Sequence, residues 1–181
     1  MVVSKGLWQQ QELIFSSDKS EVLLRPILPE DKVEIVRAFA QLSPQSRYHR
    51  FLGPLMELSP SFLSYLTEIN YVDHFALGAF CISLEEPALI GVARYVRLTD
   101  EPQSADVAVA VIDNYQHRGI GKQLLCALVS VAFENGIRRF VGNALQENQP
   151  IRGLLQQVKA QTMFEGSGVL RFEVDLAEIL G

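Results

Sequence analysis

The chain has 181 residues, a length that suits one domain with a substantial hydrophobic core. Apolar residues make up 48% and charged residues 20% of the sequence, as in ordinary globular proteins. The formal net charge of −5 argues against nonspecific nucleic-acid binding, because neutralising phosphates requires clustered Lys and Arg side chains. No secretory segment follows Met1 and no apolar run approaches membrane-spanning length, so we expect a soluble cytoplasmic protein with no membrane partner.

The first part of the chain predicts a hairpin that leads into a helix. Residues 1–10 show no periodicity and are expected to be a lead-in segment. Residues 12–15 and 21–27 are apolar runs on either side of the polar stretch Ser16–Ser20, which is typical of a β-hairpin. Pro29 is followed by two acidic residues, a pattern that indicates the first turn of a helix.

Two copies of Leu-Ser-Pro follow, at 42–44 and 58–60. Each copy places a serine where it can cap a helix and a proline at the first helical position. We therefore expect two short helices, the first running through Arg50 and the second carrying the apolar residues of 62–69. The two copies indicate helix starts and no internal repeat.

The remaining chain alternates strands and helices. Strands are predicted at 77–84, 88–98, 106–112 and 139–145, helices at 120–135 and 150–159, and a hairpin at 162–164 and 169–176. Because the strand at 139–145 follows a helix, we expect it to lie parallel to its predecessor. In the last strand Leu170, Phe172, Val174 and Leu176 alternate with polar residues, so they should face the core. The sum is a three-layer mixed sheet.

Cysteine and histidine usage points to no redox or metal centre. Cys81 and Cys126 both lie in apolar runs, which predicts buried free thiols rather than a disulfide. The histidines do not combine with cysteine or acidic residues at metal-ligand spacing, so we expect no metal site.

The stretch with the strongest chemical content is 106–122, a predicted strand, turn and helix start. The first N–H groups of a helix have no internal partner, and the helix dipole places partial positive charge there. Gly119 and Gly121 leave the backbone bare at this point, with Arg118 and Lys122 adding charge. The pattern predicts an anion site built mostly from backbone.

Three motifs compete for this stretch. A Walker loop requires Ser or Thr after the lysine, where this chain has Gln123, and a dinucleotide fingerprint requires a third glycine, where it has Leu124. The pattern Gln/Arg-x-x-Gly-x-Gly/Ala of the GNAT N-acyltransferases is matched in full by Gln116–Gly121. A tight turn that needs glycine for its backbone dihedrals explains the six residues equally well, so the motif alone leaves both readings open.

Over residues 12–176 the chain resembles the GNAT superfamily. Four segments of its first half are similar to the acetyltransferase domain of bacterial Pat-type protein lysine acetyltransferases: Leu24–Asp31, Leu42–Tyr48, Arg50-Phe51 and Leu66–Ile69. The resemblance implies a GNAT fold of the α/β (α+β) class in a single domain over 1–181. Its mixed, mostly antiparallel sheet would have a central, splayed parallel strand pair and helices on both faces. Pat-type domains are often fused to a nucleotide-sensing or synthetase-like domain, which we do not recognise here, so regulation by such a domain is expected to be absent or supplied separately.

The same resemblance implies an acetyl-CoA site. The pyrophosphate would lie on the N–H groups of 118–121, and the pantetheine would extend the sheet from the strand at 109–111. The implied cofactor-binding residues are Val109, Ala110, Val111, Gln116, His117, Arg118, Gly119, Ile120, Gly121, Lys122 and Asn148. Asn148 is as readily explained as a plain cap of the following helix.

Asp106 stands where the similar Pat-type domains carry a catalytic glutamate, which implies a general base one methylene shorter. The alternative is a strand-end carboxylate paired with Arg94 or solvent. Many superfamily members use a tyrosine to protonate the departing thiolate, but this chain has Leu155 at that position. His117 should be exposed, whereas His49 and His74 lie in segments that border the acceptor side.

The expected function is transfer of acetyl from acetyl-CoA to an amine, with a protein lysine as the expected acceptor. Arg47 and Tyr48 would then help to form the acceptor mouth. A small-molecule amine acetyltransferase is the alternative within the same class. A non-catalytic module that senses acyl-CoA is the alternative outside it, because the base is shortened and the tyrosine is missing.

Overall fold

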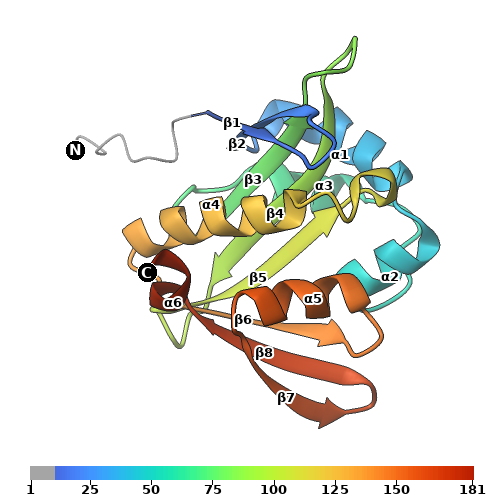
Figure 1. The fold of residues 1–181 in the computed structure, drawn as a ribbon. Helices are drawn as coiled ribbons and strands as arrows, with labels where there is room; N and C mark the ends of the chain where they lie inside the picture. Colours follow the sequence, from blue (N-terminus) through green and yellow to red (C-terminus); the bar gives the residue numbers. More distant parts are fainter. Residues whose placement is uncertain (1–10) are drawn as a thin grey trace.

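The structure is a computed structural model that describes residues 11–181, and Figure 1 shows its fold. These residues form one eight-stranded sheet in the order β1-β2-β3-β4-β5-β6-β8-β7. Its strands are β1 Glu12–Phe15, β2 Glu21–Pro26, β3 His74–Cys81, β4 Ala88–Arg97, β5 Ser104–Val111, β6 Arg139–Leu145, β7 Gln161–Gly166 and β8 Val169–Asp175. The mixed, mostly antiparallel sheet predicted from the sequence is confirmed.

Helices cover both faces of the sheet (Figure 1). They are α1 Lys32–Ala40, α2 Pro44–Phe51, α3 Pro60–Thr67, α4 Ile120–Glu134, α5 Gln149–Gln157 and α6 Leu176–Leu180, with short 3-10 turns η2 Pro29–Asp31 and η3 Asp113–Tyr115. Side chains of α4, α5 and α6 share one hydrophobic core with the sheet. Side chains of α1 and α3 form a second, smaller core with its other face. The three-layer arrangement buries the apolar residues of both strand faces.

Strands β5 and β6 are the parallel pair, and they diverge. Their pairing covers only Ser104↔Arg139, Ala105↔Phe140 and Asp106↔Val141. Beyond Asp106, β5 continues beside β4 as far as Val111, while β6 continues beside β8. Figure 1 shows the two arrows separating in this direction. The predicted splay therefore begins at Asp106, and the β6-facing backbone edge of β5 has no strand partner after it.

The two predicted serine caps are confirmed. The Ser43 hydroxyl accepts a hydrogen bond from the Ser46 N–H at 3.1 Å and starts α2. The Ser59 hydroxyl accepts from the Phe62 N–H at 3.2 Å and starts α3. In both helices proline occupies the first turn, where its missing N–H costs nothing.

The end of the chain differs from the prediction. Strand β8 stops at Asp175, whose carboxylate accepts a hydrogen bond from the Ala177 N–H at 2.9 Å and caps α6. Leu170, Phe172 and Val174 face the core as predicted, and Leu176 is buried too, but from α6 rather than from a strand. The alternation extended to Leu176 because a helix that begins there also turns its first residue inward.

Several predictions stand apart from this description. The lead-in segment 1–10 lies outside the described residues, so a single domain over 1–181 stays a prediction. Within 11–181 no helix is both long and apolar enough to cross a bilayer, and the cytoplasmic location stays a prediction. Both cysteines are free thiols, with Cys81 buried and Cys126 partly buried.

Candidate functional site

A cleft of about 620 Å³ opens where β5 and β6 separate, a volume within the usual range of ligand sites. Its walls come from β5, the 113–122 segment, α2, β6 and α5. Ten of the eleven residues predicted to bind the cofactor line it: Val109, Ala110, Val111, Gln116, His117, Gly119, Ile120, Gly121, Lys122 and Asn148. Arg118 does not line the cleft. The fold therefore brings together a set that the sequence spreads over 40 positions.

The N-terminus of α4 forms one end of the cleft. Gly119 is its N-cap with φ 80°, and no side chain caps the helix. The N–H groups that open the helix thus remain available to an anion. His117 also has positive φ, 59°, so the loop turns sharply twice within three residues. This is the bare backbone cradle that a pyrophosphate requires.

The two glycines of the loop serve different purposes. Gly119 adopts the left-handed conformation that disfavours any side chain, in agreement with the turn explanation. Gly121 is helical, and a Cβ there would lie 3.8 Å from the side chains of Val109 and Val111 in ordinary contact. A turn alone does not require glycine at 121.

Gln116 and Asp113 tie this loop to α2. The Gln116 amide donates to the Val111 carbonyl at 3.0 Å and to the Ser46 hydroxyl at 3.3 Å. The Asp113 carboxylate accepts from the Ser43 N–H at 2.9 Å and from the Ser46 hydroxyl at 3.0 Å. The side chain of Gln116 therefore holds the two walls of the cleft together.

Arg118 does not line the cleft, although its charge was expected to help to bind an anion there. Its guanidinium forms an ion pair with Asp18 in the β1–β2 turn, and its carbonyl accepts from the Ser17 N–H at 3.1 Å. Hydrogen bonds from Ser16 and Ser20, with a smaller contribution from Arg118, lower the pKa of Asp18 to about 2. The charge of Arg118 is thus paired with Asp18 at the protein surface. Lys122, which lines the cleft, forms no ion pair with the described residues.

Asn148 caps α5, since its side-chain oxygen accepts from the Ile151 N–H at 3.2 Å. It also lines the cleft. The cap is confirmed, and the contact with a cofactor arm stays a prediction.

Asp106 is the last residue of β5 that pairs with β6, so it marks the fork of the two strands. Strand alternation places it on the same face as Ala108 and Ala110. The Asp106 side chain is exposed, yet partial desolvation by the surrounding protein raises the pKa of its carboxyl, and the nearby Arg50 guanidinium partly offsets the rise. Arg94 is not its partner: Arg94 donates to His74 at 2.8 Å and to the Leu66 carbonyl at 2.9 Å.

The main residue that sequence reasoning missed is Arg50. It projects from α2, lines the cleft, and is the charged group that acts on Asp106. Its neighbours Arg47 and His49 differ from it. Arg47 donates to the carbonyls of Leu42, Ala40 and Met56 and so clamps a turn. No spacing rule separates the three, because the difference arises from which side of α2 faces the fork.

The histidines fall on the expected sides of the molecule. His117 is exposed, as predicted. His49 borders the cleft, with its Nε2 3.4 Å from the Glu147 carboxylate. His74 contacts Arg94, and burial together with the Arg94 charge lowers its pKa to about 4, so it is neutral at pH 7.

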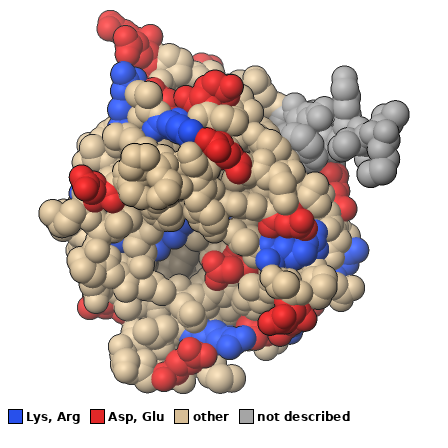
Figure 2. All heavy atoms as spheres, turned by 180° about the vertical axis from the view of Figure 1, so that it is seen from behind, with Lys and Arg blue, Asp and Glu red and all other residues tan. Residues whose placement is uncertain are grey.

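The face of the molecule shown in Figure 2 is hollowed near its middle, with basic side chains inside the hollow and an acidic side chain at its edge. Within 11–181 no three His, Cys, Asp or Glu side chains gather as metal ligands.

The model of the acetyltransferase (GNAT) family matches residues 43–158. The chain belongs to the GNAT acetyltransferase family. The chain is 34% identical over 159 residues to Acetyltransferase Pat of Mycolicibacterium smegmatis, covering 86% of this chain and 46% of that protein. It is also 34% identical over 137 residues to Acetyltransferase PA5475 of Pseudomonas aeruginosa, covering 76% and 73%. It therefore spans about half the length of the first relative and most of the second.

Solved structures agree with this membership. The GNAT domain of S. lividans PAT superposes with a TM-score of 0.83 at 29% identity, covering 91% of this chain and 96% of that one. The yncA acetyltransferase of Salmonella typhimurium, solved with its cofactor acetyl-CoA, superposes with a TM-score of 0.68 at 14% identity, covering 86% and 94%, and so shares the fold. GNAT acetyltransferases use acetyl-CoA as the acetyl donor. The backbone cradle and the cleft fit such a ligand.

Proposed function

We propose that this protein transfers the acetyl group of acetyl-CoA to the side-chain amine of a lysine in a protein, with Asp106 as general base. The observation that carries the proposal is a carboxylate at the fork of β5 and β6, beside a cleft that ends on the uncapped N-terminus of α4. The protein-lysine acceptor is supported by the likeness to proteins named Pat, over most of this chain.

Each wall of the cleft has a part in binding. The N–H groups at the start of α4 would hold the pyrophosphate, with Lys122 adding charge. The unpaired edge of β5 at Val109–Val111 would accept the pantetheine amides as an added strand. Acetyl-CoA, as co-substrate, supplies the acetyl thioester that the free amine attacks, with the CoA thiolate as leaving group.

Asp106 would prepare the acceptor. A lysine ammonium has a pKa of about 10.4 and no lone pair, so it must lose a proton before it attacks. The raised pKa of Asp106 brings the carboxylate closer to the basicity that proton transfer requires. Because Asp is short, the proton would pass through one water. Leu155 is buried in the core, so α5 offers no general acid at that position to protonate the CoA thiolate. A thiol with a pKa of about 8.5 can leave without such an acid.

The test is release of free CoA from acetyl-CoA in the presence of lysine-containing proteins, with mass spectrometry of the acceptor, and a parallel panel of small amines. We expect turnover with at least one protein and a mass increase of one acetyl group on lysine. Turnover with small amines alone would show that the acceptor is a small molecule and not a protein. Tight acetyl-CoA binding without CoA release for any acceptor would favour a sensor over a transferase.

A further inference from the structure

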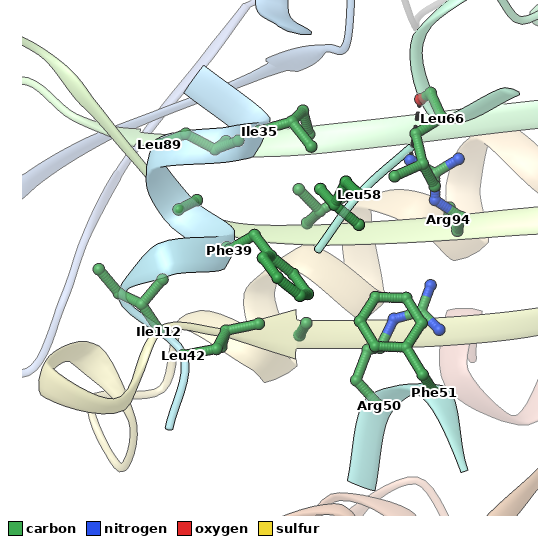
Figure 3. Close-up of a pocket in the computed structure, with 14 residues that line it drawn as sticks. Ile35, Phe39, Leu42, Arg50, Phe51, Leu58, Leu66, Leu89, Arg94 and Ile112 are labelled. Atoms are coloured by element: carbon green, nitrogen blue, oxygen red, sulfur yellow. Dashed lines mark hydrogen bonds between the residues drawn. The ribbon is translucent and has the colours of Figure 1, made fainter. Parts of the chain in front are cut away.

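On the side of the sheet covered by α1–α3 lies a second, smaller pocket of about 70 Å³ (Figure 3). It adjoins the cleft, because Leu42, Arg50 and Ala110 line both. Most of its wall is apolar, with Leu42 and Ile112 among the side chains drawn at one end. Arg50 and Arg94 lie together at the other end (Figure 3). Two arginines in an apolar pocket require a physical explanation.

Neither arginine forms an ion pair with a carboxylate of residues 11–181. Arg94 is only 5% exposed and donates to His74 and to the Leu66 carbonyl, both neutral groups at pH 7. Arg50 makes no hydrogen bond to the residues that the structure describes. Within 11–181 no carboxylate oxygen lies within 4.0 Å of either guanidinium.

The charges around the pocket do not balance. The groups that act on Arg50 and Arg94 are Asp106, Tyr65, His74 and each other. Asp106 is the one carboxylate among these groups, so two positive charges share it. The repulsion between them is felt, because burial and Arg50 together lower the pKa of Arg94 to about 10. Buried charges in proteins are normally paired, and an unpaired one is costly.

We propose that Arg50, with Arg94 behind it, forms a subsite for a carboxylate carried by the substrate, next to the amine that is acetylated. A guanidinium with free N–H groups in an apolar wall is the standard partner for a carboxylate. The position beside Asp106 places the anion close to the reacting centre. A volume of about 70 Å³ has room for a small group of this kind.

This inference rests on the proposed transfer to an amine, and it narrows the substrate. The carboxylate has two possible sources: the acceptor, as an acidic residue beside the target lysine or the α-carboxylate of a free amino acid, or the acyl group of the donor. The shared chemistry is a carboxylate within reach of Arg50. Three matched substrate pairs separate the sources. They are a lysine peptide flanked by Glu and its Gln counterpart, lysine and cadaverine, and succinyl-CoA and acetyl-CoA.

The variants are Arg50→Met, which removes the charge at similar size, and Arg50→Lys, which keeps the charge without the planar, bidentate guanidinium. Arg37→Met is the control, because Arg37 is exposed on α1 and pairs only with Glu34. Each pair is compared within one variant, so any effect of Arg50 on Asp106 cancels from the ratio of kcat/KM. We expect the parent to prefer the carboxylate member of one pair by about tenfold or more. Arg50→Met should abolish that preference, Arg50→Lys keep part of it, and Arg37→Met keep all of it.

A binding measurement keeps the subsite testable without turnover. Sodium propionate should raise the thermal midpoint above that in sodium chloride at equal ionic strength, in the parent and Arg37→Met but not in Arg50→Met. If no acceptor turns over while propionate still stabilises through Arg50, the transferase proposal fails and the subsite stands. Equal use of both members of every pair, or a preference that survives Arg50→Met, would overturn the subsite.

Discussion

The two walls of the cleft are built by different means. The wall at the start of α4 consists of consecutive residues, 116–122, and acts through backbone N–H groups that glycine leaves bare. The opposite side is built from side chains: Arg50 of α2 in the cleft wall, Arg94 in the smaller pocket that adjoins the cleft, and Asp106 at the fork of β5 and β6. In the proposed function the first wall holds acetyl-CoA and the second selects the acceptor.

This difference determines which substitutions should affect each wall of the cleft. A backbone site depends on dihedral angles and on the absence of Cβ atoms, so single glycines carry it. A side-chain site depends on burial and on the balance of charges, so its properties follow from partners far away in the sequence. Changes on the acceptor side should alter rate and selectivity, whereas changes at α4 should alter cofactor affinity.

The largest effect is expected for Asp106→Asn. The amide cannot accept the proton, so kcat should fall about a hundredfold or more at pH 7 while acetyl-CoA affinity is kept. In the parent, activity should fall as pH drops through the folded-state pKa of Asp106, which lies above its ordinary value. The variant's deficit should shrink at high pH, where free amine forms without help. Steady-state kinetics from about pH 4 to about pH 10, with calorimetry of acetyl-CoA, measures both.

The free energy of unfolding of Asp106→Asn serves as the control for its kinetics. Because the folded-state pKa of Asp106 is raised, ionisation destabilises the fold progressively as pH rises from the unfolded to the folded pKa, and fully above it. A neutral amide should therefore not lower stability at neutral pH. Turnover of Asp106→Asn equal to that of the parent at pH 7 would show that the base is another group or solvent.

The next effect is expected on the α4 wall, for Gly121→Glu. Its side chain would extend from a position beside Val109 and Val111 into the cleft and repel the phosphates. Acetyl-CoA affinity should fall at least about tenfold, roughly 1.4 kcal/mol, by calorimetry. Gly121→Ala is the matched variant, since its Cβ makes only ordinary contacts at 3.8 Å. Unchanged affinity in a folded Gly121→Glu protein would remove this end of α4 from the cofactor site.

The two walls also differ in how far the sequence predicts them. The strand–turn–helix of 106–122 was predicted because its signals are local: β-branched residues, then glycines, then helical spacing. Arg50 and Arg94 were not, because 44 residues separate them and neither spacing nor composition shows that they share a pocket. The Arg118–Asp18 pair was missed for the same reason, since a hairpin turn must fold onto the loop to create it.

A third comparison separates conformation from ligand contact. Gly119 and Gly136 stand at the two ends of α4 with nearly equal φ, 80° and 83°. Alanine at either position should cost about 1 kcal/mol of stability, because left-handed backbone disfavours a Cβ. Only Gly119→Ala should also weaken acetyl-CoA binding, by about fivefold, since it alone shapes the cradle. Thermal unfolding and calorimetry on both variants test this, and an equal loss of affinity at Gly136 would mean that helix stability, not the loop, governs binding.

The smallest effect concerns the two cations of the loop, Arg118 and Lys122. By sequence they are equivalent, one on each side of the glycines. By structure Arg118 is neutralised by Asp18, whereas Lys122 lines the cleft without an ion pair among the described residues. Lys122→Met should therefore lower acetyl-CoA affinity about threefold at low salt, a loss that salt screens, while Arg118→Met should change it less than about twofold. If Arg118→Met has the larger effect, the guanidinium leaves Asp18 for the phosphates when the ligand binds, and the turn at Ser16–Ser20 becomes part of the cofactor site.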